Sequence, residues 1–226
     1  MIRALAVVAF AVAAAGAQTH TMGEGSHRME LMLERLDGDT WRPIDPGLVL
    51  NQGDRVRFKF RTNFDGFLYV MDQATSGKYE QLFPRLDTGQ ENRIAASHEY
   101  LVPATSAAFR IAGPAGYEIV YWLVTPARIT EGIPRTTPAA PPATRPAPVL
   151  IPRCDDTVLK ARGDCVDSSA GPKLIPRGQQ IPPHLADPFD KGPRDLMFLR
   201  QKDTSVISSP EPLTGPVMYE FRLAHR

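Results

Sequence analysis

Apolar and charged residues alternate most regularly between Arg55 and Arg61. Because successive side chains of a strand point to opposite faces, this order predicts a strand with one apolar face and one cationic face. The apolar face consists of Val56, Phe58 and Phe60. The cationic face consists of Arg55, Arg57, Lys59 and Arg61.

Other short apolar runs lie between turn residues and are also predicted to be strands. Residues 67–71 follow an Asp-Gly pair, and a Ser-Gly turn joins them to Tyr79–Phe83 as a hairpin. Glu99–Val102 and residues 109–111 are predicted to be shorter strands. Residues 117–125 are apolar on both faces, which predicts a central strand that is covered on both sides.

Residues 28–36 fit two periodicities. A strand would gather Met29, Leu31 and Leu33 on one face. A helix would gather Met29, Met32, Leu33 and Leu36. An Asp-Gly pair follows directly, and Trp41 and Ile44 come after it, so we predict a strand that enters a hairpin.

Strand character returns near the C-terminus, in residues 196–199 and 217–223. The second of these segments has one apolar face, formed by Val217, Tyr219, Phe221 and Leu223. We expect this face to dock on the N-terminal sheet, because a proline-rich segment offers little surface to bury it. The predicted fold is therefore all-β: an antiparallel immunoglobulin-like sandwich with a long proline-rich excursion and a C-terminal strand that docks back.

Most of the 22 prolines lie between Pro126 and Pro193. Proline lacks a backbone donor and favours extended conformations, so this part is predicted to be a linker or strap. Cys154 and Cys165 lie within it and are predicted to form a local disulfide. Asp155 or Asp156 could cap a helix at 157–161, the only helix that the sequence predicts.

The N-terminus has the pattern of a secretory signal peptide, with Arg3 before an apolar run and small residues after it. Cleavage is expected between Ala17 and Gln18, and a buried helix is disfavoured because the run has no polar face. We therefore expect a periplasmic or secreted protein, with no transmembrane segment in the mature chain. The predicted divisions are a signal peptide (1–17), a flexible N-terminus (18–27), a β-sandwich domain (28–127), a proline-rich strap with a small disulfide loop (128–194) and C-terminal strands that complete the sandwich (195–226).

A family resemblance rests on several short motifs taken in order. They are Gln52-Gly53-Asp54-Arg55-Val56, Gly66-Phe67-Leu68-Tyr69-Val70, Gly77, Leu82-Phe83-Pro84, Asn92-Arg93-Ile94, Val102-Pro103 and Gly116-Tyr117-Glu118. With these motifs, residues 29–126 resemble a bacterial domain of unknown function found in envelope and secreted proteins, where it is sometimes fused to caspase-like peptidase or protein-kinase domains. Arg85 departs from the pattern, in which asparagine is expected. The resemblance implies an immunoglobulin-like sandwich and no established activity, and it supplies no catalytic residues.

The remaining sequence offers little chemistry. A net charge of +1 argues against a nucleic-acid partner. His98 lies beside Ser97 and Glu99, but neighbours in a strand point to opposite faces and would not act together. The acids Asp155, Asp156, Asp164 and Asp167 lie around the cysteines, where helix capping and solvation explain them as well as calcium does. The five histidines lack ligand spacing: His20, His27, His98, His184 and His225. We expect no catalytic, cofactor or metal site.

The cationic face allows two interpretations. It could bind an anionic envelope polymer or lipid headgroup, or it could be a solvated face that is partly paired with acids on neighbouring strands. We expect an exported, non-enzymatic binding or scaffolding domain that contacts an envelope protein or polymer through a strand edge or the strap. The alternatives are an accessory subunit of an envelope or secreted enzyme system, and a hydrolase whose site one sequence does not reveal.

Overall fold

The structure is a computed structural model. It describes residues 26–75, 77–129, 136–137, 151–161, 163–176, 179, 181, 183–192, 195–201, 203–210 and 215–226. The expected signal peptide, its cleavage site and most of the expected flexible N-terminus lie outside these residues.

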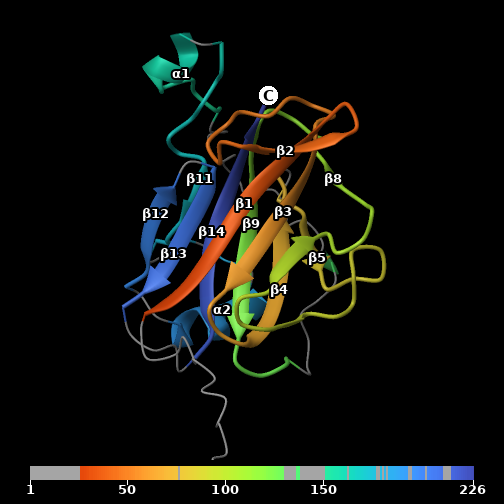
Figure 1. The fold of residues 1–226 in the computed structure, drawn as a ribbon, viewed down its shortest axis with the longest axis vertical. Coiled ribbons are helices and arrows are strands. Elements are labelled where there is room, and N and C mark those ends of the chain that lie inside the picture. The colour runs from red at the N-terminus through yellow and green to blue at the C-terminus, as the bar shows by residue number, and fades with distance from the viewer. Residues whose placement is uncertain are drawn as a thin grey trace, which may run out of the picture.

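Two antiparallel sheets face each other (Figure 1). The first sheet has the order β12-β13-β1-β3-β7, with β2 paired to β1 and β8 paired to β3. Its strands are β1 (His27–Asp37), β2 (Thr40–Ile44), β3 (Arg55–Thr62), β7 (Glu99–Val102), β8 (Phe109–Arg110), β12 (Met197–Gln201) and β13 (Thr204–Ser209). β1 is a strand throughout and forms the predicted hairpin with β2, which rules out the helical interpretation.

The second sheet has the order β10-β5-β4-β9-β14-β11, with β6 paired to β4. Its strands are β4 (Gly66–Gln73), β5 (Tyr79–Phe83), β6 (Arg93–Ile94), β9 (Gly116–Thr125), β10 (Thr136–Thr137), β11 (Gly171–Lys173) and β14 (Val217–His225). β14 pairs with β9 along its full length, so the C-terminal strand docks back as predicted. The all-β antiparallel sandwich is confirmed.

The main core fills the space between the sheets. Val56, Phe58 and Phe60 of β3 are fully buried there, as the alternation predicted. The ring of Trp122 on β9 stacks on Phe60 and meets Phe58 edge-on, at centroid distances of 5.3 and 5.2 Å. Aromatic contacts of this kind join the two sheets and stabilise them beyond the area that they bury.

A second apolar cluster covers the outer face of the second sheet and explains why β9 is apolar on both faces. On the sheet it contains Tyr69, Met71, Tyr79, Tyr121, Leu123 and Met218. Ile175 and Leu185, from the segment predicted to be a strap, pack on these residues and are 2 % and 0 % exposed. These parts of the proline-rich region therefore contribute to the core.

The strap also contains a helix that the sequence did not predict. α2 (Pro183–Lys191) packs on β14, so the prediction of a single short helix is wrong. Proline inside a helix removes a backbone hydrogen bond, and Pro188 therefore argued against a helix here. Burial of Leu185 against the sheet offsets that cost. β13 was not predicted either, because its Thr-Ser-Val-Ile-Ser-Ser sequence is only weakly apolar.

Cys154 and Cys165 form the predicted disulfide. It closes the loop that carries α1 (Thr157–Ala161), which projects from one end of the sandwich in Figure 1. Oδ1 of Asp156 accepts hydrogen bonds from the amides of Val158 and Leu159 at 3.0 and 2.9 Å, so Asp156 is the helix cap. Val166, directly after the bridge, is buried and anchors the loop to the sandwich.

Candidate functional site

The predicted cationic row lies on the outer face of the first sheet, beside the acids of β1. Arg57 Nε donates to Glu34 Oε2 at 2.6 Å, and Lys59 Nζ lies 3.6 Å from Glu34 Oε1. Arg61 Nη2 donates to Glu30 Oε2 at 2.6 Å. Three of the four cations therefore have carboxylate partners. This agrees with the interpretation of the row as a face that is partly paired with acids on neighbouring strands. Anion binding by the row stays a prediction.

Arg55 differs from the other three cations. It is exposed and lies directly across from Arg110 in the β3–β8 pair. Among the residues that the structure describes, neither arginine has an ion-pair partner. Like charges opposite each other in a sheet repel, so this end of the row is the part most open to an anion.

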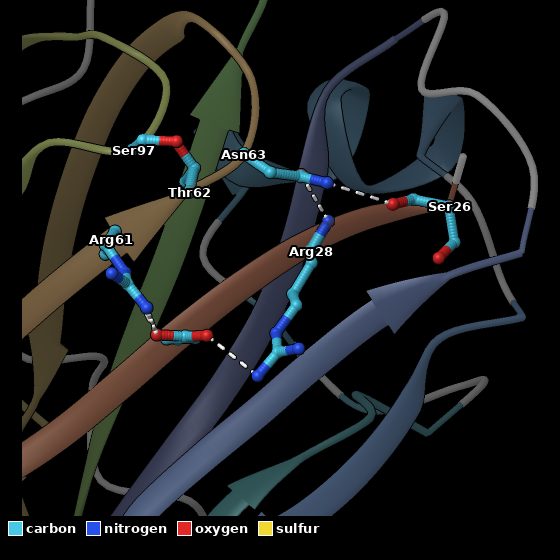
Figure 2. A pocket seen from close by; sticks show the side chains of 7 residues that line it. Ser26, Arg28, Arg61, Thr62, Asn63 and Ser97 are labelled. Carbon is cyan, nitrogen blue, oxygen red and sulfur yellow. Dashed lines mark hydrogen bonds and ion pairs between the residues drawn. The ribbon is translucent and has the colours of Figure 1, made fainter. Parts of the chain in front are cut away.

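A shallow groove of about 340 Å³ continues the row at its other end, and its seven lining residues are drawn in Figure 2. Arg28 Nη2 lies 2.8 Å from Glu30 Oε1, and Arg61 Nη2 lies 2.6 Å from Glu30 Oε2, so the two arginines hold the two oxygens of one carboxylate. Asn63 Nδ2 donates to the Ser26 carbonyl, and Asn63 Oδ1 accepts from the Arg28 amide. Glu30 therefore occupies the place that an external anion would take between the two guanidinium groups.

The remaining predicted residues have local structural roles. His98 is exposed and contacts the ring of Tyr100, with 4.8 Å between the ring centroids. Asp155 accepts hydrogen bonds from the amide and hydroxyl of Ser168, and Asp167 accepts from the Arg153 and Ser169 amides. No group of three or more His, Cys, Asp or Glu side chains in the described part of the chain is arranged to hold a metal ion.

A cleft of about 370 Å³ opens where β8 faces the ends of β4, β5 and β9, on the side where Figure 1 labels β8 and β5. Its apolar lining includes Leu82, Phe109, Ile111, Val120 and Leu223. Its charged lining consists of Asp72, Lys78, Glu80, Arg85, Arg110 and Glu118. Acidic and basic groups thus converge on one apolar-walled cavity.

Strand alternation places the acids inside this cleft. Leu68 and Val70 of β4 face the main core, and Asp72 is the next residue on the same face. On β9, Val120 and Trp122 face the core, and Glu118 precedes them on that face. Glu80 lies directly across from Asp72 in the β4–β5 pair. The cleft is therefore the open end of the sandwich interior, where carboxylates replace the apolar residues.

The carboxyl groups of Asp72 and Glu118 each have an oxygen whose lost contact with water is not replaced by a hydrogen bond from the described residues. Asp72 Oδ1 and Glu118 Oε2 are shielded from solvent and have no hydrogen-bond partner in the part of the chain that is described. Burial, followed by repulsion from Glu118 and Glu80, raises the pKa of Asp72 well above its usual range. Asp72 therefore keeps its proton to a higher pH than an exposed aspartate does.

A buried histidine lies beside Glu118. His225, on β14, is 1 % exposed, and its Nε2 lies 3.3 Å from Glu118 Oε1. Neither of its ring nitrogens has a hydrogen-bond partner among the described residues. The end of the sandwich interior thus holds three polar side chains whose hydrogen-bonding capacity is not filled.

The cations of the cleft lie at its rim and are mostly engaged with rim acids. Lys78 Nζ donates to Glu80 Oε2 at 3.3 Å, and Arg85 bonds to both Glu80 and Asp87. Arg110 is exposed at the rim. The rim is therefore positive and partly neutralised, whereas the floor is acidic.

The sequence contained a signal for this cleft. An inward-facing strand position that carries an acid where its neighbours are apolar breaks the alternation, and such breaks mark candidate functional sites. In the first strand, the alternation of 67–71 continues to Asp72, which takes an inward-facing position. In the second strand, Glu118 lies two residues before the inward-facing Val120 and shares its face. Their proximity needed the pairing of β4 with β9, which the sequence did not reveal.

Residues 49–128 match the family model of a domain of unknown function, DUF4384. This part of the chain is similar to that family. The resemblance to a domain-of-unknown-function family is confirmed, although the match begins after β1 and β2 and covers under half of the chain. Asp72, Glu80 and Glu118 lie within DUF4384, whereas Leu223 and His225 lie outside it. No curated protein and no solved structure matches the chain.

None of the described helices is long and apolar enough to cross a membrane.

Proposed function

We propose that the chain is an exported, non-enzymatic binding domain of the bacterial cell envelope, and that the cleft beside β8 is its binding site. Export is supported by the signal-peptide pattern at the N-terminus and by the disulfide, which is typical of oxidising compartments. The ligand or partner is an envelope protein or polymer.

One observation supports the cleft above the other surfaces: Asp72 Oδ1 and Glu118 Oε2 are buried acceptors that find no donor among the described residues, and both residues line an open, apolar-walled cavity. Leaving such atoms unpaired costs about 1–3 kcal/mol each, and a ligand that supplies donors recovers this energy. In the Arg28–Arg61 groove, by contrast, Glu30 already fills the corresponding role.

The strap is a weaker candidate for the contact. Ile175 and Leu185, two of its buried apolar residues, cover the second sheet. An exposed edge remains at β12, where Met197 and Leu199 are 55 % and 57 % exposed. This edge is separated from the cleft by the width of the first sheet, so one contact would not cover both. We assign the binding to the cleft.

Cross-linking in intact cells tests this proposal. The tagged chain and its Asp72→Asn/Glu118→Gln variant are expressed equally, and captured envelope components are identified by mass spectrometry. We expect a reproducible partner that the variant loses and that a Glu99→Gln control retains, because Glu99 lies on the other sheet at 58 % exposure. Equal capture by all three chains would refute the assignment to the cleft. The same samples test export, since the mature N-terminus should be Gln18.

A hydrolase is the second candidate, and the raised pKa of Asp72 beside Glu118 favours it. Two carboxyl groups that share one proton can divide the roles of acid and base. Peptide, ester and glycoside substrates offered to the purified chain distinguish the two functions. Turnover that is lost in Asp72→Asn would overturn the non-enzymatic proposal.

A further inference from the structure

We propose that the cleft recognises a primary alkylammonium group, which is held between Asp72 and Glu118 with its alkyl stem along the apolar wall. This inference rests on the proposed function and names the chemistry of the ligand. Lysine side chains of a peptide and free diamines share this chemistry.

The charge of the ligand follows from the carboxylates at the cleft. Asp72 and Glu118 both line it, and their mutual repulsion favours a positive guest, whereas Glu80 is already paired with Lys78 and Arg85. The charge of Lys78 attracts Asp72, but its ammonium donates to Glu80, as the Arg85 guanidinium does, and Arg110 is exposed at the rim. His225 approaches Glu118 but forms no hydrogen bond to it.

The shape of the charged group follows from the two acceptors. Asp72 Oδ1 and Glu118 Oε2 belong to different carboxyl groups on neighbouring strands. An ammonium is a compact charge with three donors and can reach both oxygens at once. A guanidinium instead presents a planar fork that suits the two oxygens of a single carboxylate.

The apolar walls of the cleft suit the alkyl stem of the ligand. Leu82, Phe109, Ile111 and Leu223 line the cleft and offer van der Waals contact to a chain of methylenes. Once the ligand is bound, its neutral stem lies beside the positive rim of Lys78, Arg85 and Arg110, and its ammonium group lies deeper, beside the acids. A cavity of about 370 Å³ lies within the size range of small-molecule sites, which is roughly 300–1,000 Å³.

Binding should release a proton. The ammonium stabilises the charged form of Asp72, whose pKa is raised in the free cleft, so binding lowers this pKa and a proton passes to the buffer. The other titratable groups near the pair are Lys78, Glu80 and His225, besides the arginines of the rim. Proton release distinguishes binding beside Asp72, whose pKa is raised, from loose attraction to carboxylates on the surface.

Isothermal titration calorimetry of the mature chain at pH 7 tests the inference with three probes. They are Nα-acetyl-lysine amide, cadaverine, and Nα-acetyl-norleucine amide, which has the stem without the charge. We expect at least one ammonium probe to bind, norleucine amide to fail, and the heat to differ between phosphate and Tris buffers because a proton is released. Tighter binding of the lysine amide points to a peptide ligand, and tighter binding of cadaverine points to a free diamine.

Variants locate the binding site. Asp72→Asn and Glu118→Gln should each weaken binding by roughly tenfold or more and reduce the proton release, whereas Glu99→Gln should change neither. Equal binding of norleucine amide, no heat with millimolar ammonium probes, or unchanged affinity in both cleft variants would overturn the inference. If partner capture depends on Asp72 and Glu118 while no ammonium probe binds, the proposed function stands and only the ligand class is wrong. If an ammonium probe binds but no partner is captured, the ligand class stands and the proposed envelope partner is wrong.

Discussion

Asp72 and Glu118 face the same side of the second sheet from the neighbouring strands β4 and β9, and repulsion from Glu118 helps to raise the pKa of Asp72. Interior strand positions normally carry apolar side chains, and here the apolar series of both strands ends in an acid. A buried carboxyl group that is repelled by a neighbouring carboxylate, as Asp72 is by Glu118, does not ionise readily. The pair therefore costs folding energy at neutral pH, and this cost is typical of groups kept for binding or catalysis.

Replacing Asp72 with Asn should stabilise the folded chain at neutral pH. The pKa of Asp72 is raised in the folded state, so its stabilising effect is complete only below the unfolded pKa and is lost as the pH rises through the folded value. The amide has no proton to lose, and it can donate to Glu118. We expect the melting temperature at pH 7 to rise by roughly 2–4 °C, the effect of about 1 kcal/mol in a domain of this size. Calorimetry at pH 4 should show a smaller gain, and an equal gain at both pH values would contradict the explanation.

Replacing Glu34 with Ala should destabilise the first sheet. Glu34 is 4 % exposed, and it pairs with Arg57, which stacks over Trp41, and with Lys59. Removing it leaves a half-buried guanidinium without its partner, which should cost about 1–3 kcal/mol. Glu99→Ala removes an exposed partner of Lys59 and should stay within about 0.5 kcal/mol of the wild type. Urea unfolding of both variants measures the difference, and equal losses would contradict it.

Strand positions could be predicted where one face is buried and the other is solvated. β3 shows this pattern and was predicted with the right inward-facing residues. The inward-facing residues of β14 were also predicted correctly, although both of its faces are buried. The packing of β9 was also predictable, because a strand that is apolar on both faces needs cover on both sides. The identity of that cover was not predictable, since it comes from Ile175 and Leu185 far along the chain.

α2 and the cleft were missed for different physical reasons. Local propensity disfavours a helix with an internal proline, and tertiary packing of Leu185 overrides this preference. The cleft depends on which strands are neighbours, because Asp72, Glu80 and Glu118 come from three strands that meet only in the folded sheet. A single sequence shows the broken alternation at each acid but not their proximity.

Replacing both cysteines with serine should loosen the α1 loop and lower stability. The bridge joins residues 11 apart in sequence, and α1 has no buried residue to hold it in place. Loss of the cross-link should cost about 2–3 kcal/mol. Hydrogen exchange should accelerate first between residues 154 and 166, where the hydrogen bond from the Val49 amide to the Cys165 carbonyl ties the loop to the sandwich. Unchanged exchange there, with the unfolding free energy also unchanged, would show that the loop holds without its bridge.

Replacing Leu185 with Ala tests whether α2 is part of the core. Leu185 is fully buried against the cluster that contains Tyr121 and Leu123, so truncation leaves a cavity on the outer face of the second sheet. Such truncations cost about 2–5 kcal/mol, and the loss should appear as a lower urea midpoint with an unchanged slope. Val158→Ala removes a similar apolar group from α1 at 62 % exposure and should leave the midpoint nearly unchanged. If Leu185→Ala were equally neutral, α2 would be a detachable segment, and the strap would again be a candidate for partner binding. A clear loss means that deleting the strap unfolds the sandwich, so binding that disappears on deletion would not locate a contact.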